Sequence, residues 1–101
     1  MNSGLSPATV AGIRQVLASF PPVESAVLYG SRAKGNFKPG SDIDLTLFGP
    51  DINGAVLADI ANALDDLLLP LVIDLSVYSM LDNQELIDHI DRVGVVFYDK
   101  T

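Results

Sequence analysis

Apolar residues recur along the chain with two different spacings, and turn residues separate the segments that carry them. Three segments have apolar residues at helical spacing: 7–20, 55–68 and 83–92. Four shorter segments are apolar and rich in β-branched residues, which favours strands: 23–29, 43–48, 71–78 and 95–98. Between the first two strands, residues 30–41 are polar and contain three glycines, which predicts a loop.

The order of these elements predicts the fold class. A chain of 101 residues holds one domain rather than two, so we expect a single domain over residues 1–101. Helices alternating with strands predict an α/β or α+β architecture, with a small mixed β-sheet of about four strands and helices packed on one face. The other face of the sheet would then be open.

Composition narrows the classes of function. The chain has 13 acidic and 6 basic side chains, a net charge of −7, and no cysteine. This charge argues against a general nucleic-acid binder, and the lack of cysteine excludes a disulfide scaffold and a thiol nucleophile. The longest apolar run, 67–73, is too short to span a membrane. We therefore expect a soluble cytoplasmic domain.

Half of the basic residues lie in the predicted loop 30–41: Arg32, Lys34 and Lys38. A glycine-rich turn after a strand, with cations and free backbone N–H groups, suits a polyphosphate. An ordinary surface loop remains the alternative.

Three aspartates stand in or next to predicted strands, two at the start of 43–48 and one within 71–78. Asp42 and Asp44 are two residues apart, so they lie on one face of a strand, about 6–7 Å apart. Asp74 interrupts an otherwise apolar strand. If the two strands are neighbours, the three carboxylates share one face and favour Mg²⁺ or Mn²⁺. Such a trio can hold two ions for phosphoryl or nucleotidyl transfer. Solvated carboxylates, or an Asp74 paired with an arginine, remain the alternatives.

These motifs together carry a resemblance that covers nearly the whole chain. Gly30-Ser31, ten further residues, Asp42-Ile43-Asp44 and then Ile73-Asp74-Leu75 resemble the signature of the DNA polymerase β nucleotidyltransferase superfamily. Within it, the chain is similar to the minimal nucleotidyltransferase (MNT) proteins of the MntA antitoxin type. The family opening Gly-Ser-Arg-Ala-Arg-Gly appears here with Lys34 in place of its second arginine.

The resemblance implies a nucleotidyltransferase fold and a role for each matching residue. Asp42 and Asp44 would bind two Mg²⁺ ions, and Asp74 would bind the catalytic ion and draw the proton from the attacking hydroxyl. Gly30 and Ser31 would hold the triphosphate of ATP. The basic residues that follow them, Arg32 and Lys34, would contact its phosphates.

The resemblance also implies a partner. AMP would pass from ATP to a hydroxyl of a HEPN-domain toxin, in a toxin–antitoxin complex, and the short chain has no separate domain to recognise an acceptor. Two alternatives stay open: a catalytically silent module that binds nucleotide and partner, and the catalytic subunit of an enzyme that modifies small molecules such as antibiotics.

Two residues near these motifs are given no catalytic role. We interpret His89 as a surface residue on an acidic helix. Tyr29, which precedes Gly30, is interpreted as a core residue, with stacking on a nucleotide base as the alternative.

Overall fold

The computed structural model describes residues 3–101, so residues 1–2 of the expected domain lie outside the described residues. Within this range the helices are α1 (Pro7–Ala18), α2 (Gly30–Lys34), α3 (Gly54–Asp65) and α4 (Gln84–Val93), with one 3₁₀ turn, η1 (Tyr78–Met80). The strands are β1 (Ser25–Tyr29), β2 (Ile43–Phe48), β3 (Ile73–Val77) and β4 (Val95–Asp99).

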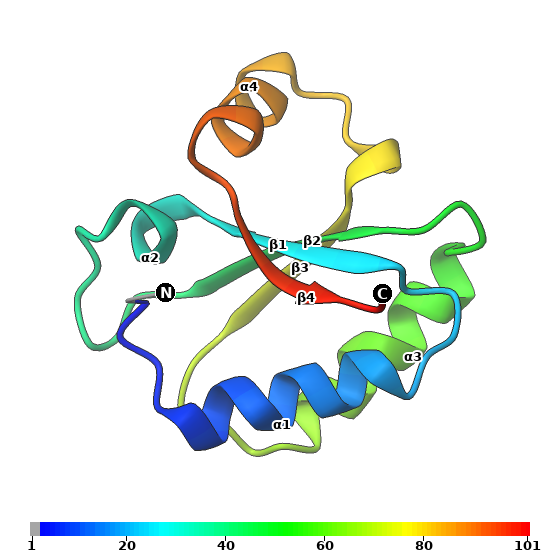
Figure 1. Ribbon diagram of the computed structural model, residues 1–101, viewed down its shortest axis with the longest axis horizontal. Helices are drawn as coiled ribbons and strands as arrows, with labels where there is room; N and C mark the ends of the chain where they lie inside the picture. The colour runs from blue at the N-terminus through cyan, green and yellow to red at the C-terminus, as the bar shows by residue number, and fades with distance from the viewer. Residues whose placement is uncertain (1–2) are drawn as a thin grey trace.

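The strands form one mixed sheet in the order β3-β2-β1-β4 (Figure 1). β1 pairs antiparallel with both β2 and β4, whereas β2 and β3 are parallel. The predicted fold class, a small mixed sheet of four strands with helices, is confirmed. No helix in residues 3–101 is long and apolar enough to cross a membrane.

One face of the sheet carries the hydrophobic core. Helices α1 and α3 lie across this face (Figure 1). Their buried residues pack with alternate residues of the strands in one cluster: Ile13, Leu17, Ile60, Leu64, Leu28, Ile43, Leu45, Leu47 and Phe97, among others. Each such side chain contributes roughly 1.5–3 kcal/mol on burial, so this face is the main source of stability.

The ends of the helices follow from local sequence. The Ser6 hydroxyl accepts a hydrogen bond from the Thr9 N–H, and proline occupies the first position of α1. The hydroxyl pairs one of the free N–H groups at the start of the helix, and proline has no N–H group to leave unpaired there. The side chains of Asn53 and Asn83 accept equivalent bonds at the starts of α3 and α4.

The second face of the sheet is only partly open. We expected helices on one face, but α4 lies on the side opposite α1 and α3 (Figure 1). Two buried apolar side chains fall outside the main core cluster, Tyr29 and Ile90, and Ile90 belongs to α4. The helix therefore covers the end of β1 and leaves the parallel pair β2–β3 as the more open part of this face.

Candidate active site

The three aspartates come together where β2 and β3 run side by side. The two strands are parallel neighbours, and their register sets Asp44 directly opposite Asp74. Asp42 immediately precedes β2, and both Asp42 and Asp74 are exposed, while Asp44 is half-buried. The expectation that these two strands are neighbours is confirmed. Arg14, one of the arginines that could have paired with Asp74, instead donates to the carbonyl oxygen of Phe97 at 2.8 Å.

The charges of these carboxylates act on one another. Burial raises the pKa of Asp44 above its ordinary value, and the charges of Asp74 and then Asp42 raise it further. Asp44 is therefore close enough to both of the other carboxylates to be repelled by them, and a bound cation would relieve that repulsion.

The donor set fits a hard divalent cation. All three side chains offer carboxylate oxygens, which Mg²⁺ and Mn²⁺ prefer to nitrogen or sulfur. Within residues 3–101, however, no three acidic or histidine side chains converge closely enough to form a ready-made cage. Mg²⁺ commonly takes one or two carboxylates, with water and substrate phosphates as its other ligands, so an open set of aspartates suits it.

A second structural unit, the Gly-Ser turn (Gly30 and Ser31), lies against the carboxylate of Asp44. β1 ends at Tyr29, and α2 begins at Gly30 with a positive φ of 74°. A Cβ atom at Gly30 would overlap the carboxylate of Asp44. Only glycine combines this backbone conformation with so close an approach. The turn and Asp44 are thus two sides of one site, and Ser31, the residue after Gly30, is half-buried.

Arg32 lies elsewhere than we expected for a phosphate contact. Its guanidinium is buried, 2% exposed, and donates to the carbonyl oxygens of Ser41, Pro39 and Ser3 at 2.8 to 3.2 Å. It also lies over the Phe37 ring, 5.2 Å from the centroid. In this arrangement the guanidinium braces the 35–41 loop instead of facing the carboxylates. Local sequence could not reveal this, because every acceptor is a main-chain carbonyl.

The other two cations of the loop differ from Arg32. Lys34 is exposed at the end of α2, and Lys38 is exposed beyond it. Their ammonium groups are free to meet an anion, so the expected phosphate contact of Lys34 stays a prediction.

Hydroxyl and aromatic side chains lie on the same face of the sheet as the carboxylates, further along β2 and β3. Thr46 and Ser76 are opposite in the register of β2 and β3, and the Ser76 hydroxyl donates to the Thr46 hydroxyl at 2.9 Å. One step further, the rings of Phe48 and Tyr78 stack with centroids 4.7 Å apart. Alternation along the strands puts these pairs on the face of Asp44.

Tyr29 and His89 form the wall of the site beside β1. Burial raises the pKa of the Tyr29 hydroxyl, a hydrogen bond with Ser76 opposes that shift, and the charges of Asp74 and Asp44 add to it. Tyr29 is buried, as expected, but on the side of the carboxylates. The His89 ring meets it edge-on, with centroids 6.1 Å apart.

His89 was interpreted as a surface residue, and that interpretation is wrong. Its Nε2 atom accepts a hydrogen bond from the Gly30 N–H at 3.1 Å, across 59 positions in the chain, and the residue is half-buried. No sequence signal indicates such a contact, because it depends on α4 docking over the end of β1.

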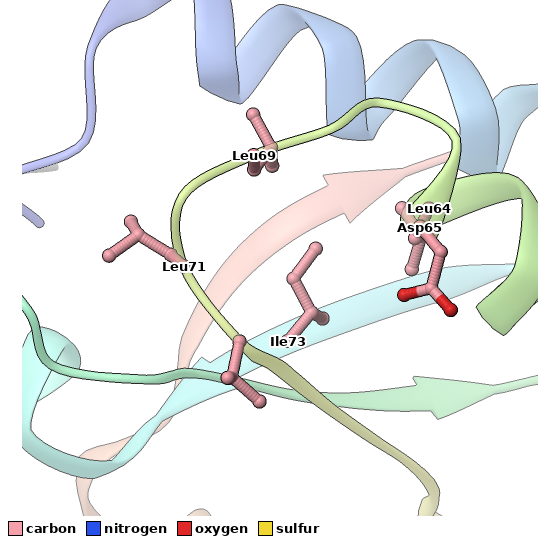
Figure 2. A pocket seen from close by; sticks show the side chains of 6 residues that line it. Leu64, Asp65, Leu69, Leu71 and Ile73 are labelled. Atoms are coloured by element: carbon pink, nitrogen blue, oxygen red, sulfur yellow. The ribbon is translucent and has the colours of Figure 1, made fainter.

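One pocket away from this site lies on the core side of the sheet. Its volume is about 200 Å³, and its lining comes from the end of α3, the segment that follows it and the first residue of β3: Leu64, Asp65, Leu69, Leu71, Val72 and Ile73 (Figure 2). Ile73 points away from the face of Asp74 because adjacent strand residues alternate. The pocket is smaller than the roughly 300–1,000 Å³ of ordinary ligand sites, and it offers no cation for a phosphate.

Comparison with known families agrees with this geometry. Residues 12–101 match the family described as polymerase beta, nucleotidyltransferase. The chain belongs to the polymerase β nucleotidyltransferase family. The resemblance that Gly30-Ser31 and Asp42-Ile43-Asp44 carry is thereby confirmed. A sequence comparison with curated proteins found no match.

Solved structures of MNT antitoxins share the fold. A toxin–antitoxin complex with AMP-PNP aligns over 89% of this nucleotidyltransferase chain and 73% of its own, with a TM-score of 0.72 and 21% identity. A mutant MntA–HpeT toxin–antitoxin structure aligns over 89% of this chain and 72% of its own, with a TM-score of 0.69 and 17% identity. The MNT antitoxin complex with a tri-AMPylated HEPN toxin from Shewanella oneidensis aligns over 91% of this chain and 71% of its own, with a TM-score of 0.67 and 18% identity.

Proposed function

We propose that this chain is a Mg²⁺-dependent nucleotidyltransferase that transfers AMP from ATP to a hydroxyl group of a partner protein. The observation that carries the proposal is the opposition of Asp44 and Asp74 in adjacent parallel strands, with the Gly30 turn against Asp44. A catalytically silent binding module would gain nothing from carboxylates that repel one another.

The carboxylates do the chemistry. Asp42, Asp44 and Asp74 would hold two Mg²⁺ ions, or Mn²⁺, and the bound ions would neutralise charge on the attacked phosphate and on the leaving pyrophosphate. Asp74 accepts the proton of the acceptor hydroxyl. The oxygen of that hydroxyl bonds to the α-phosphorus of ATP, and the bond from this phosphorus to the bridging oxygen of the β-phosphate breaks. The acceptor keeps AMP, and pyrophosphate departs.

The Gly-Ser turn holds the triphosphate. Backbone N–H groups and the Ser31 hydroxyl bind its oxygens, and the exposed Lys34 adds a positive charge. Arg32 serves this site by holding the 35–41 loop, which leads directly into Asp42.

The partner is a HEPN-domain toxin, and the chain is its antitoxin. Two of the similar structures support this: one toxin–antitoxin pair was crystallised with AMP-PNP, and one HEPN toxin is tri-AMPylated in its complex with an MNT antitoxin. ATP and Mg²⁺ are available in the cytoplasm, where we place the reaction.

The test is a transfer assay with the protein encoded by the neighbouring gene, which we expect to contain a HEPN domain. Both proteins are incubated with labelled ATP and Mg²⁺, and label on the partner is measured. Wild type transfers label, and Asp42→Asn does not. The control is Asp59→Asn, an exposed aspartate of α3 on the core side of the sheet, which keeps full transfer.

Two other results would replace the proposal. If no label moves while the complex forms equally well with Asp42→Asn, the chain is a binding module. If label moves to an added small-molecule alcohol such as an aminoglycoside and not to the protein, the chain is a subunit of a small-molecule-modifying enzyme.

A further inference from the structure

His89 reaches the Gly-Ser turn from a helix that is distant in sequence. α4 lies over the end of β1, and the His89 Nε2 atom accepts the hydrogen bond of the Gly30 N–H at 3.1 Å. The same ring meets the edge of Tyr29. The imidazole is thereby held by two residues that border the carboxylates.

The direction of this hydrogen bond fixes the chemistry of the ring. A nitrogen that accepts an N–H must present a lone pair, so Nε2 carries no proton and the proton of the neutral ring is on Nδ1. His89 therefore acts here as an acceptor for main-chain N–H and not as an acid.

Gly30 is confined from two directions. On its Cα side the Asp44 carboxylate leaves no room for a Cβ atom. On its N–H side His89 fixes the orientation of the peptide between Tyr29 and Gly30. The observed φ of Gly30 is 74°, but a glycine can adopt many other conformations. The two contacts select the one in which Gly30 lies against the Asp44 carboxylate.

The hydrogen bond between His89 and Gly30 is not what holds α4 against the rest of the fold. Ile90 of α4 is buried, and the Tyr78 hydroxyl donates to the Asp91 carboxylate at 2.7 Å. These contacts hold α4 without His89, so a change at position 89 tests the turn and not the folding of the helix.

We propose that His89 is a positioning residue for the Gly-Ser turn: by accepting the Gly30 N–H it holds the turn in the conformation that binds the triphosphate. This inference rests on the proposed function. The ring does not touch the reacting atoms, and its effect passes through the main chain of Gly30.

The first test measures nucleotide affinity with AMP-PNP and Mg²⁺. His89→Leu removes the acceptor and keeps an apolar side chain against Tyr29, and it weakens binding about three- to tenfold, the effect of one net hydrogen bond. His89→Gln offers an amide oxygen as acceptor and recovers part of the affinity. Glu85→Gln, an exposed change one turn earlier on α4, leaves the affinity unchanged.

The second test needs no activity. In the nucleotide-free wild type, ¹⁵N NMR of His89 shows the Nδ1-protonated ring, with a coupling from Nε2 to the Gly30 amide. A ring protonated at Nε2 would overturn the inference. This measurement decides the matter even if His89→Leu proves unstable.

The remaining outcomes separate the two proposals. Failure of the wild type to bind the nucleotide overturns the proposed function, and this inference with it. Wild-type binding that is equally tight, or tighter, in His89→Leu overturns the inference alone, because His89 would then be idle or would compete with phosphate for Gly30.

Discussion

Asp44 is the residue at which stability and function oppose one another. Its pKa is raised above 3.8, first by burial and then by the charges of Asp74 and Asp42. The folded chain therefore binds this proton more tightly than the unfolded chain. As pH rises from 3.8 through the raised pKa, the free energy of unfolding therefore falls.

Asp44→Asn removes this destabilising charge. The variant is expected to unfold at a higher temperature than wild type at neutral pH, with the difference shrinking as pH falls towards 3.8. It also loses nucleotidyl transfer. Thermal unfolding across a pH series checks the first part, and a variant that melts lower than wild type at neutral pH would contradict the account.

Gly30 gives a second prediction at this scale. In Gly30→Ala the new methyl group meets the Asp44 carboxylate, and the positive φ adds about 1–2 kcal/mol of backbone cost. The melting temperature falls and nucleotide binding is lost. Gly35→Ala is the matched control, because Gly35 also has a positive φ, 85°, but nothing lies within 4 Å of its Cβ position.

Gly35→Ala should lose only the backbone free energy, and each kcal/mol lost lowers the melting temperature by about 4–8 °C in a domain of this size. The variant should keep nucleotide binding. Equal binding by the two alanine variants would show that the contact between Gly30 and Asp44 has no part in the site.

Sequence could predict the aspartates but not every partner of the Gly-Ser turn. Asp42 and Asp44 share a strand face by spacing alone, and Asp74 stands out because a carboxylate interrupts an apolar strand. His89 could not be found in this way, because its partner is a main-chain N–H across the fold. The burial of Arg32 could not be predicted for the same reason, because its hydrogen-bond acceptors are main-chain carbonyl groups.

Among the secondary-structure elements, the strand positions could be predicted from apolar runs. The segment 30–41, predicted to be a loop, begins with a short helix. α2 has five residues, Gly30–Lys34, too few for helical periodicity to register. The third strand is also shorter than predicted, Ile73–Val77, because the chain turns into η1 at Tyr78. Such short elements are stabilised by tertiary contacts more than by their own propensity.

The 35–41 loop gives a prediction at the element scale. Arg32→Lys keeps the charge but loses the planar fork that reaches Ser3, Pro39 and Ser41 together. We expect a loss of roughly 1.5–3 kcal/mol, the scale of hydrogen bonds to a charged group, and faster proteolysis within the loop. Lys34→Gln, at an exposed position, leaves stability within about 0.5 kcal/mol but weakens nucleotide binding.

Thermal unfolding and nucleotide titration of both variants check this separation. If Arg32→Lys were as stable as wild type, the guanidinium would not brace the loop. If Lys34→Gln bound the nucleotide normally, Lys34 would have no phosphate contact.

At the scale of the whole molecule, the sheet divides two tasks between its faces. The face under α1 and α3 is apolar and supplies the core. The opposite face carries aspartates, hydroxyls and the Gly-Ser turn, with α4 covering one end. The net charge of −7 includes the three aspartates of this face, Asp42, Asp44 and Asp74.

In the proposed reaction the α-phosphate of ATP is the one transferred, and pyrophosphate is the leaving group. Two parallel reactions with the HEPN-domain partner and Mg²⁺ test it, one with ATP labelled at the α-phosphate and one with ATP labelled at the γ-phosphate. We expect the α-label to appear on the partner and the γ-label to appear in pyrophosphate. A γ-label on the partner, or no label on it from either ATP, would contradict the account.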